Sequence, residues 1–394
     1  MYVYYFLAAL ACWFGFQSLL NGLRFAAYVR RETSCALPDY FPFVSVIAPT
    51  RGVDDGFAEN VQPLMDQDYS AHEVIFVFDD PEDAAVQIVK HLGGRTVISG
   101  PAKGMGQKVH NLIVAVGAID PKCEVIVFVD TDARPDKDWL RKLVAPLSDE
   151  NIGASSGYRW FIPQRGGLAS RLRGVWNASI ASALGENTSK NFCWGGSTAI
   201  RRSTFERLNV VEHWAGTVSD DFTITKVLKD AKLPVHFTAN CLLPSVGDCE
   251  FRELLEFTTR QIKITRVYAS HLWLPLLLGS ALFTIVFFGG IVLALVLAWM
   301  GLSYWVVSAV LAILFVLGAA KGFIRWRAVG IPLASYKHAL RRDMLAQVFL
   351  WPFASLLYLY NTIVAGFSRR IRWRGITYEL KSPHEAVIIS REPA

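Results

Sequence analysis

The sequence is poor in charged residues, which make up 19% of its 394 positions, against about 25% in an average soluble domain. Apolar residues reach 52% of the chain, and the mean hydropathy is +0.30. These values argue against a disordered, collagen-like or wholly soluble protein. The charges that are present concentrate between residues 24 and 266, which disfavours a pure membrane bundle. We therefore predict a soluble domain that is held on a membrane.

Paired cysteines and basic clusters are also missing. The six cysteines form no CxxC pair and follow no regular spacing, which disfavours a disulfide framework or a zinc site and fits a reducing compartment. The net charge is only +6, and no block of Lys and Arg alternates with aromatic residues, so we expect no nucleic-acid partner. The sequence has no internal repeat and no low-complexity segment. Its basic residues lie beside the apolar segments, where they suit anionic lipid headgroups.

The first apolar segment comprises residues 2–23, which carry no charge and are long enough to span a bilayer. A cleaved signal peptide is the alternative, but this segment lacks a basic start and is followed by Arg24, Arg30 and Arg31. A retained anchor is therefore expected over residues 1–23. By the positive-inside rule, these arginines predict a cytoplasmic location for the domain that follows.

Further apolar runs cover residues 272–300, 302–320 and 344–366. The last of them is interrupted at Trp351-Pro352, and four arginines follow it between positions 369 and 374. A simple fourth span would leave those arginines outside, so a re-entrant hairpin near Pro352 is favoured. We expect a multi-pass membrane protein with a cytoplasmic catalytic domain, and the number of spans after residue 343 stays open.

The part between the membrane segments has the pattern of an α/β domain. Short apolar, β-branched runs predict buried strands, and helical patterns separate them. The expected strands are residues 43–49, 74–78 and 125–129, and the expected helices are residues 57–65, 84–92 and 108–118. This alternation predicts an open, mostly parallel sheet whose ligands bind beyond the carboxyl ends of the strands. Acidic and basic residues follow each strand there, namely Arg51/Asp54, Asp79/Asp80 and Asp130/Asp132.

Two acidic pairs carry the expected chemistry. Asp130 and Asp132 follow a buried strand at positions i and i+2, which suits a shared Mg²⁺ or Mn²⁺ that also binds substrate phosphates. Asp220 and Asp221 precede a helix expected over residues 222–230. Acidic residues there commonly cap the helix, and the functional alternative is a general base for an acceptor hydroxyl. One member of the pair suffices for each role.

Three further segments are candidate binding elements. Lys103 and Lys108 lie beside a glycine-rich loop, and either is a candidate to meet a diphosphate, although such a loop is weak evidence by itself. Trp194, Gly195 and Gly196 suit either a sugar or acyl platform or an ordinary tight turn with a half-buried Trp. Residues 251–268 form an amphipathic pattern directly before an apolar run. This pattern predicts an interfacial helix, and the interfacial segment is expected over residues 251–270.

The ordered set of motifs resembles the ceramide glucosyltransferase family and its bacterial relatives. The order is VSVIAPTRGVD from Val44, DDP from Asp79, KVHNL from Lys108, DTD from Asp130, WGGSTAIRR from Trp194 and SDDF from Ser219. A basic helix then enters the membrane, and WRGITYEL follows from Trp373. The resemblance covers nearly the whole chain. It implies an inverting GT-A-fold glycosyltransferase that uses a nucleotide sugar.

The resemblance also implies residue roles. It puts Pro49, Arg51, Lys108 and Asp130 at the nucleotide-sugar donor, with Asp79 or its neighbour Asp80 binding the nucleotide. It makes Asp130 and Asp132 the metal-binding pair, Asp221 the general base and Trp194 to Gly196 part of the acceptor site. On the helix before the membrane, Arg260 matches the family motif. Lys263 and Ile264 stand where the family has Arg and Trp. Arg266 is the substitute considered for the lost arginine.

The function implied is transfer of a hexose, with glucose expected, from a UDP-sugar to a lipid hydroxyl, with ceramide as the first acceptor considered. A hopanoid or glycerolipid acceptor, a processive polysaccharide synthase and a catalytically inactive membrane scaffold are the alternatives. Expected cofactors and partners are Mg²⁺ or Mn²⁺, the UDP-sugar, the lipid and the bilayer. The expected organisation is an anchor (1–23), a GT-A domain (24–250), the interfacial helix (251–270), a transmembrane or re-entrant region (271–366) and a basic cytoplasmic tail (367–394).

Overall fold

The computed structural model describes residues 1–392 and divides into two compact units. The strand unit consists of residues 31–162, 184–247 and the segment from 369 onward. The helical unit consists of residues 1–30, 163–183 and 248–368. Both units are therefore assembled from segments far apart in the sequence.

The strand unit contains a large mixed sheet. Its strands, all within residues 44–246, are β1 (Val44–Pro49), β2 (His72–Phe78), β3 (Arg95–Ile98), β4 (Val125–Val129), β5 (Ala154–Ile162), β6 (Ser197–Arg201) and β7 (Val235–Val246). They lie in the order β3-β2-β1-β4-β6-β5-β7. The first four are mutually parallel, β6 is antiparallel to β4 and β5, and β5 is parallel to β7. The predicted α/β GT-A-type architecture is confirmed.

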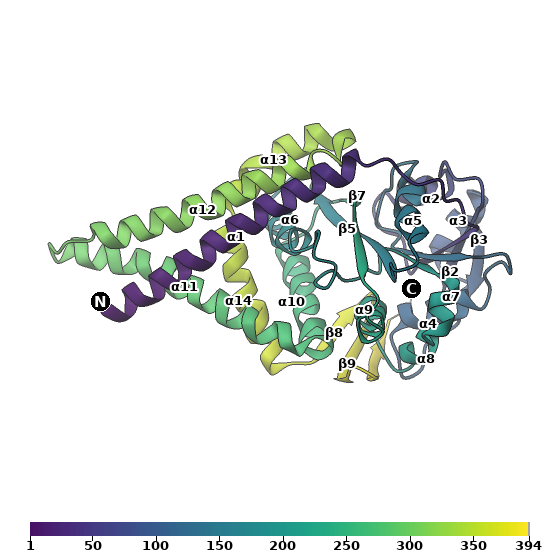
Figure 1. Ribbon diagram of the computed structural model, residues 1–394. Coiled ribbons are helices and arrows are strands. Elements are labelled where there is room, and N and C mark those ends of the chain that lie inside the picture. The colour runs from purple at the N-terminus through teal and green to yellow at the C-terminus, as the bar shows by residue number, and fades with distance from the viewer. Residues whose placement is uncertain (393–394) are drawn as a thin grey trace. The chain divides into compact units, whose positions relative to one another are not determined.

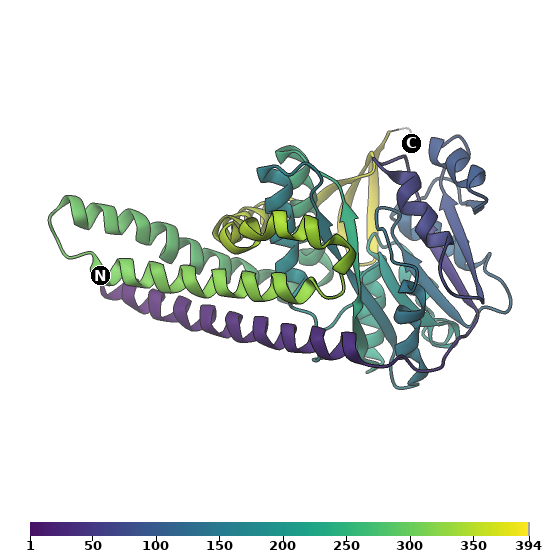
Figure 2. The same ribbon diagram turned by 90° about the horizontal axis from the view of Figure 1, so that it is seen from above.

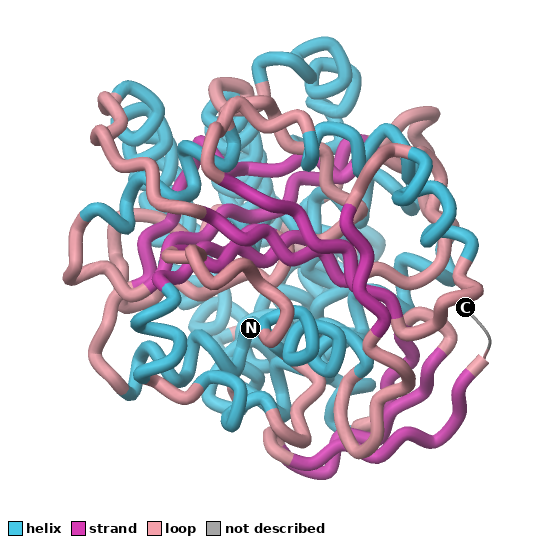
Figure 3. Tube along the Cα trace, turned by 90° about the vertical axis from the view of Figure 1, so that its right-hand side faces the viewer, coloured by secondary structure: helices cyan, strands magenta, loops and turns pink. Residues whose placement is uncertain are grey.

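Helices flank this sheet, as Figure 3 shows. They are α2 (Phe57–Met65), α3 (Ala84–His91), α4 (Gln107–Val116), α5 (Trp139–Val144), η1 (Ala145–Ser148), α7 (Arg202–Arg207), α8 (Val210–Trp214) and α9 (Asp220–Asp230). The predicted strands and helices of the first half of the domain are confirmed, with ends that differ by at most two residues. Strand β4 is buried along its whole length, as expected of a parallel strand covered on both faces. The hydrophobic core of the strand unit includes Ile47, Ile126 and Phe128.

The segment expected as a basic cytoplasmic tail folds as part of the strand unit. Strands β8 (Arg370–Trp373), β9 (Ile376–Ser382) and β10 (Glu385–Arg391) form a second, antiparallel sheet. Figure 3 shows it as a separate group of strands near the C-terminus. Its alternating pattern buries Ile376, Tyr378 and Leu380 on one face and leaves basic side chains on the other. The tail is therefore an ordered element of the domain.

The helical unit contains the long apolar helices. Its elements are α1 (Tyr2–Ser34, which ends in the strand unit), α6 (Leu168–Ala181), α10 (Phe251–Tyr268), α11 (Ser270–Trp299), α12 (Trp305–Val329), η2 (Ala334–Tyr336), α13 (Lys337–Phe349) and α14 (Trp351–Phe367). Helices α11 and α12 form a hairpin, and α1 runs beside α12 (Figures 1 and 2). Ala11, Val286 and Leu314 join the three helices through one apolar cluster.

Among residues 1–392, helices α1, α11 and α12 are long and apolar enough to cross a membrane. Helix α1 continues eleven residues beyond the anchor expected over residues 1–23 and ends at Ser34. Helices α13 and α14 are separated at Leu350 by a bend of 69°, directly before the predicted break at Pro352. A proline near the first turn starts a new helix readily, since its missing N–H is not needed there.

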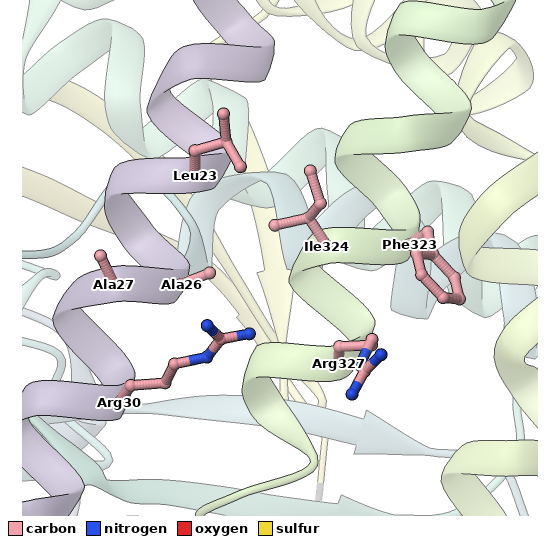
Figure 4. Close-up of a pocket in the computed structure, with 7 residues that line it drawn as sticks. All are labelled: Leu23, Ala26, Ala27, Arg30, Phe323, Ile324 and Arg327. Carbon is pink, nitrogen blue, oxygen red and sulfur yellow. The ribbon is translucent and has the colours of Figure 1, made fainter.

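A cavity of about 390 Å³ lies between α1 and α12. Figure 4 shows Leu23, Ala26 and Ile324 along its walls, with Arg30 and Arg327 at one end. Its lining contains no carboxylate. The cavity therefore lacks the acidic groups of the candidate site described next.

Candidate functional site

The centre of the site is the end of β4, where Asp130 follows the last strand residue. The Nζ atom of Lys108, in the first turn of α4, donates a hydrogen bond of 2.9 Å to Asp130 Oδ1. Burial disfavours the charge of Lys108, but the carboxylates of Asp130 and Asp220 outweigh burial and raise its pKa. Burial likewise disfavours the charge of Asp130, yet Lys108 and Arg159 hold the pKa of its carboxyl below the usual value. Both groups are therefore charged at neutral pH.

Arg159, on β5, binds both members of the predicted metal pair. Its Nη2 lies 3.0 Å from Asp130 Oδ2, and its Nη1 lies 3.2 Å from Asp132 Oδ2. The guanidinium carbon lies 4.9 Å from the centre of the Trp194 ring, a cation–π arrangement. Burial opposes the charge of Arg159, but Asp132 and Asp130 raise its pKa. Sequence reasoning missed Arg159; the available signal was one arginine inside an otherwise uncharged strand.

Asp220 is an enclosed carboxylate, with 6% of its side chain exposed. Its Oδ1 lies 3.4 Å from Lys108 Nζ, and its Oδ2 is buried and has no hydrogen-bond partner within residues 1–392. Burial raises the pKa of Asp220 to about 7; Lys108 opposes this shift, whereas the charges of Asp221 and Asp130 add to it. A carboxyl of this kind changes its protonation near neutral pH.

Asp221 has a different environment at the start of α9. Its Oδ1 accepts a hydrogen bond of 2.7 Å from the backbone N–H of Phe222 and another from the hydroxyl of Ser219. Ser219 is the N-cap residue and accepts a hydrogen bond of 3.3 Å from the same N–H, so Ser219 and Asp221 share the capping that was the alternative role for the acidic pair. Asp221 is only partly buried. The two aspartates thus differ: Asp220 is enclosed beside Lys108, and Asp221 is accessible.

The Trp194-Gly195-Gly196 segment runs close beneath these carboxylates. A Cβ atom on Gly195 would lie 2.2 Å from Asp220 Oδ2, and one on Gly196 would lie 2.2 Å from the Trp194 ring. The Gly195 carbonyl accepts a 3.2 Å hydrogen bond from Lys108. Trp194 is 8% exposed. Of the two expectations, an enclosed turn describes the segment better than an open platform for a sugar or acyl chain.

A second part of the site lies at the ends of β1 and β2, around Asp79. Its carboxylate is enclosed and ion-paired with Arg51 and, at 3.0 Å, with Arg391 of β10. Asp79 Oδ1 is buried without a hydrogen-bond partner in the described part of the chain. Burial raises the pKa of Asp79, against the effect of both arginines. An orphaned acceptor of this kind fits a ligand that donates an N–H or O–H group.

The neighbouring candidates are arranged around Asp79. Pro49 ends β1 and pairs with Val77 of β2. Asp80 is less buried, and its Oδ1 accepts a 2.9 Å hydrogen bond from the N–H of Glu82. Besides Asp79, Arg51 binds the carbonyls of Arg374 and Glu392, at 2.9 and 2.6 Å. Arg51 therefore joins the end of β1 to the C-terminal sheet.

The predicted acceptor residues Arg260, Lys263 and Arg266 belong to α10 in the helical unit. Arg266 donates a hydrogen bond to the Ala365 carbonyl, and Lys263 Nζ lies 3.3 Å from Ser368 Oγ. Arg260 stacks 5.7 Å from the Phe257 ring centre. Lys263 and Arg266 thus fix α10 to the end of α14 and its following residue.

The carboxylates of Asp130 and Asp132 have the chemistry to supply part of the coordination shell of a divalent cation. Within residues 1–392, no group of three or more His, Cys, Asp or Glu side chains has a metal-binding arrangement. Mg²⁺ and Mn²⁺ are commonly held by one or two carboxylates together with substrate phosphates. The Asp132 side chain is 34% exposed, which leaves lone pairs accessible beside Arg159. The pair therefore fits a cation whose remaining ligands come from a bound diphosphate.

Comparisons with known proteins agree on one enzyme class. A family model described as glycosyl transferase family 21 matches residues 3–386. The chain is 22% identical to ceramide glucosyltransferase 1 of Caenorhabditis elegans over 240 residues, which are 59% of this chain and 51% of that protein. It is 30% identical to ceramide glucosyltransferase 3 of the same organism over 244 residues, 59% of this chain and 52% of that protein. The chain spans about half the length of these curated relatives.

Among solved structures, the chain is similar to the mannosyltransferase PcManGT from Pyrobaculum calidifontis, in complex with GDP-mannose and Mn²⁺. The identity is 18% and the TM-score is 0.47, over 91% of this chain and 98% of that chain.

Proposed function

The chain belongs to glycosyl transferase family 21, and we propose that it transfers a sugar from a UDP-sugar to the hydroxyl of a membrane lipid with inversion at the anomeric carbon. The family match supports the resemblance stated from the motif order. Glucose is the first sugar to test and a ceramide-like lipid the first acceptor. The observation that carries the proposal is the group of Lys108, Asp130, Arg159 and Asp220 at the strand ends, where this sheet type binds ligands.

The donor nucleotide is assigned to the Asp79 side of the site. The buried, unpartnered Oδ1 of Asp79 suits the N–H of a uracil base or a ribose hydroxyl, and Asp80 lies beside it. Lys108 supplies positive charge toward the diphosphate from the end of β4. Asp130 and Asp132 would hold the divalent cation, which when bound neutralises charge on the departing UDP.

Asp221 is the proposed general base, because it is accessible where Asp220 is enclosed. The acceptor hydroxyl gives its proton to the Asp221 carboxylate while its oxygen forms the new bond to the anomeric carbon. The bond between that carbon and the diphosphate oxygen breaks, and UDP leaves with the electron pair. Asp220 positions Lys108 without touching the acceptor. No covalent enzyme intermediate is needed.

The membrane helices support a lipid acceptor. Helices α1, α11 and α12 are apolar enough to span a bilayer, and α10 carries the basic residues Arg260, Lys263 and Arg266 directly before α11. We assign α10 to the cytoplasmic interface of the membrane and to acceptor binding. Its basic residues would contact lipid headgroups or the acceptor. The strand unit is correspondingly assigned to the cytoplasm.

The experiment is metal-dependent UDP release by the full-length protein in detergent, with several UDP-sugars and with or without ceramide. Asp221→Asn should reduce turnover at least about 100-fold, the smallest effect usual for a general base, and leave UDP binding unchanged. Asp230→Asn is the matched control, since Asp230 is exposed at the far end of the same helix and pairs only locally with Lys226. Retained turnover in Asp221→Asn would refute the assignment of the base. A polymeric product would instead identify a processive synthase.

A further inference from the structure

The turn between β8 and β9 has an unusual residue at its tip. Trp373 pairs with Ile376, so Arg374 and Gly375 form a two-residue hairpin loop with φ angles of 50° and 72°. Loops with positive φ at both positions normally carry Asn, Asp or Gly, because other side chains are strained there. The turn needs no arginine for its own geometry. This indicates that the Arg374 side chain has a role outside the hairpin.

The Arg374 guanidinium reaches the loop that follows β1. Its Nη1 and Nη2 each lie 2.5 Å from one oxygen of the Asp54 carboxylate. Burial opposes its charge, but Asp54, followed by Asp132 and Asp130, raises the pKa of Arg374. The field of the predicted metal pair therefore acts on this arginine, although the two belong to different sheets.

The turn is held in place by contacts at both of its sides. Arg51 donates hydrogen bonds to the carbonyls of Arg374 and Glu392, and Arg391 pairs with Asp79. Tyr378 of β9 accepts a hydrogen bond of 3.1 Å from the N–H of Gln107, next to Lys108. The hairpin is thus fixed against the ends of β1 and β2 and the start of α4, which meet at the candidate donor site.

Arg374 also differs from the other cations of the site in accessibility. The side chains of Lys108 and Arg159 are 10% and 12% exposed and are bound to Asp130. The Arg374 side chain is 38% exposed, and its partner Asp54 is 36% exposed. Solvent and dissolved ions therefore reach both partners of this ion pair. A phosphate group offers the fork two oxygens in the same arrangement as the Asp54 carboxylate and can compete with it for Arg374.

We propose that Arg374 binds the diphosphate of the donor nucleotide, with its two Nη groups on phosphate oxygens in place of the Asp54 carboxylate. The inference rests on the proposed function and adds to it a phosphate-binding residue from the C-terminal sheet. A guanidinium fork matches two oxygens of a phosphate as it matches two oxygens of a carboxylate. Arg374 then adds positive charge at the group that leaves with UDP.

The test compares the binding of UDP and of uridine to the full chain in detergent by calorimetry, in the presence of Mn²⁺. Arg374→Ala should weaken UDP binding at least about tenfold, since it removes the charge-assisted contacts to the diphosphate, and should leave uridine binding unchanged. Unchanged uridine binding also shows that the variant is folded at the site. The matched control is Arg372→Ala, since Arg372 lies on β8 directly before the turn and pairs with the exposed Glu392 carboxylate; it should bind both ligands as the parent does.

A second variant separates direct binding from positioning through Asp54. If Arg374 only fixed the loop after β1, Asp54→Asn would weaken UDP binding as much as Arg374→Ala. The proposal expects Asp54→Asn to bind UDP at least as tightly as the parent, because a competing carboxylate is removed. Arg374→Lys, which keeps the charge and loses the fork, should recover part of the lost affinity.

The outcomes also separate this inference from the proposed function. Parental UDP affinity in Arg374→Ala, or equal losses of UDP and uridine affinity, would overturn the role of Arg374 and leave the proposed function intact. A parent protein that binds neither UDP nor any other nucleoside diphosphate would overturn both.

Discussion

Lys108 Nζ lies 2.9 Å from Asp130 Oδ1 and so connects the first turn of α4 to the end of β4 through an ion pair whose lysine is 10% exposed. The same nitrogen reaches Asp220 at the start of α9. One cation therefore organises carboxylates from two elements. The predictions below depend on this arrangement and on its surroundings.

Lys108→Met should destabilise the protein strongly. Removing one partner of a buried ion pair leaves an uncompensated charge and typically costs about 3–5 kcal/mol. Here Asp220 loses its cation, and Asp130 is left with Arg159. The measurement is thermal or denaturant unfolding followed by tryptophan fluorescence. Lys226→Met, in which an exposed i,i+4 pair with Asp230 is lost, should change the free energy of unfolding by at most about 0.5 kcal/mol; equal effects of the two changes would contradict the prediction.

The stability of the strand unit should fall as pH rises toward neutrality because of Asp220. Its pKa is raised to about 7 in the folded protein from the ordinary aspartate value of 3.8, so between these values the native state binds more protons than the unfolded state. Stability linked to this group is present at low pH and is lost as pH rises through about 7. Asp220→Asn should flatten the dependence of the unfolding temperature between about pH 4 and about pH 7. An unchanged slope in metal-free buffer would argue against a raised pKa.

Asp132→Asn should shift the metal requirement of UDP release to higher Mn²⁺ concentration. One of two carboxylate ligands is lost, and changes of this kind cost metal affinity directly. Chelation should abolish activity in the parent, and re-addition of Mn²⁺ should restore it. Asp138→Asn removes an exposed carboxylate that pairs locally with Lys142, so its Mn²⁺ dependence should match that of the parent. Activity that survives chelation would contradict the prediction.

Gly195→Ala should impair both folding and activity. The added Cβ would lie 2.2 Å from Asp220 Oδ2 and 2.8 Å from Lys108 Nζ, so the ion pair must move. We expect a loss of about 1–3 kcal/mol, as for other overpacked positions. Gly117→Ala, where the nearest atom is a carbonyl oxygen at 3.4 Å, is the control and should be near neutral. Parental activity in Gly195→Ala would show that the segment tolerates displacement.

The first half of the strand unit was predictable because each buried parallel strand is a short β-branched run with charged residues at its end, as at 125–129 before Asp130. That pattern identifies the strand, the edge of the sheet at which it ends and the carboxylate that follows it. The predictions were less informative where a residue acts through a partner far away in sequence. Arg159 lies inside β5 with no local motif, and its meeting with Asp130 and Asp132 depends on the antiparallel β6 between β4 and β5.

The C-terminal segment was misjudged for a similar physical reason. Its many arginines resemble a solvated basic tail, but alternate apolar residues such as Tyr378 and Leu380 form a buried face. Composition alone does not reveal that Arg391 pairs with Asp79, more than 300 positions earlier. The sequence contained the alternation needed to predict the strands, and the charge content obscured it.

The pairing of Arg391 with Asp79 and of Arg51 with Glu392 has a consequence for biosynthesis. Strands β1 and β2 emerge from the ribosome early, whereas β8 to β10 are made after the apolar helices of residues 270–367. Domains generally fold from the N-terminus during synthesis, so the Asp79 carboxylate first exists without Arg391. The final form of this edge therefore arises only after translation has passed residues 270–367, and the candidate donor site is completed last.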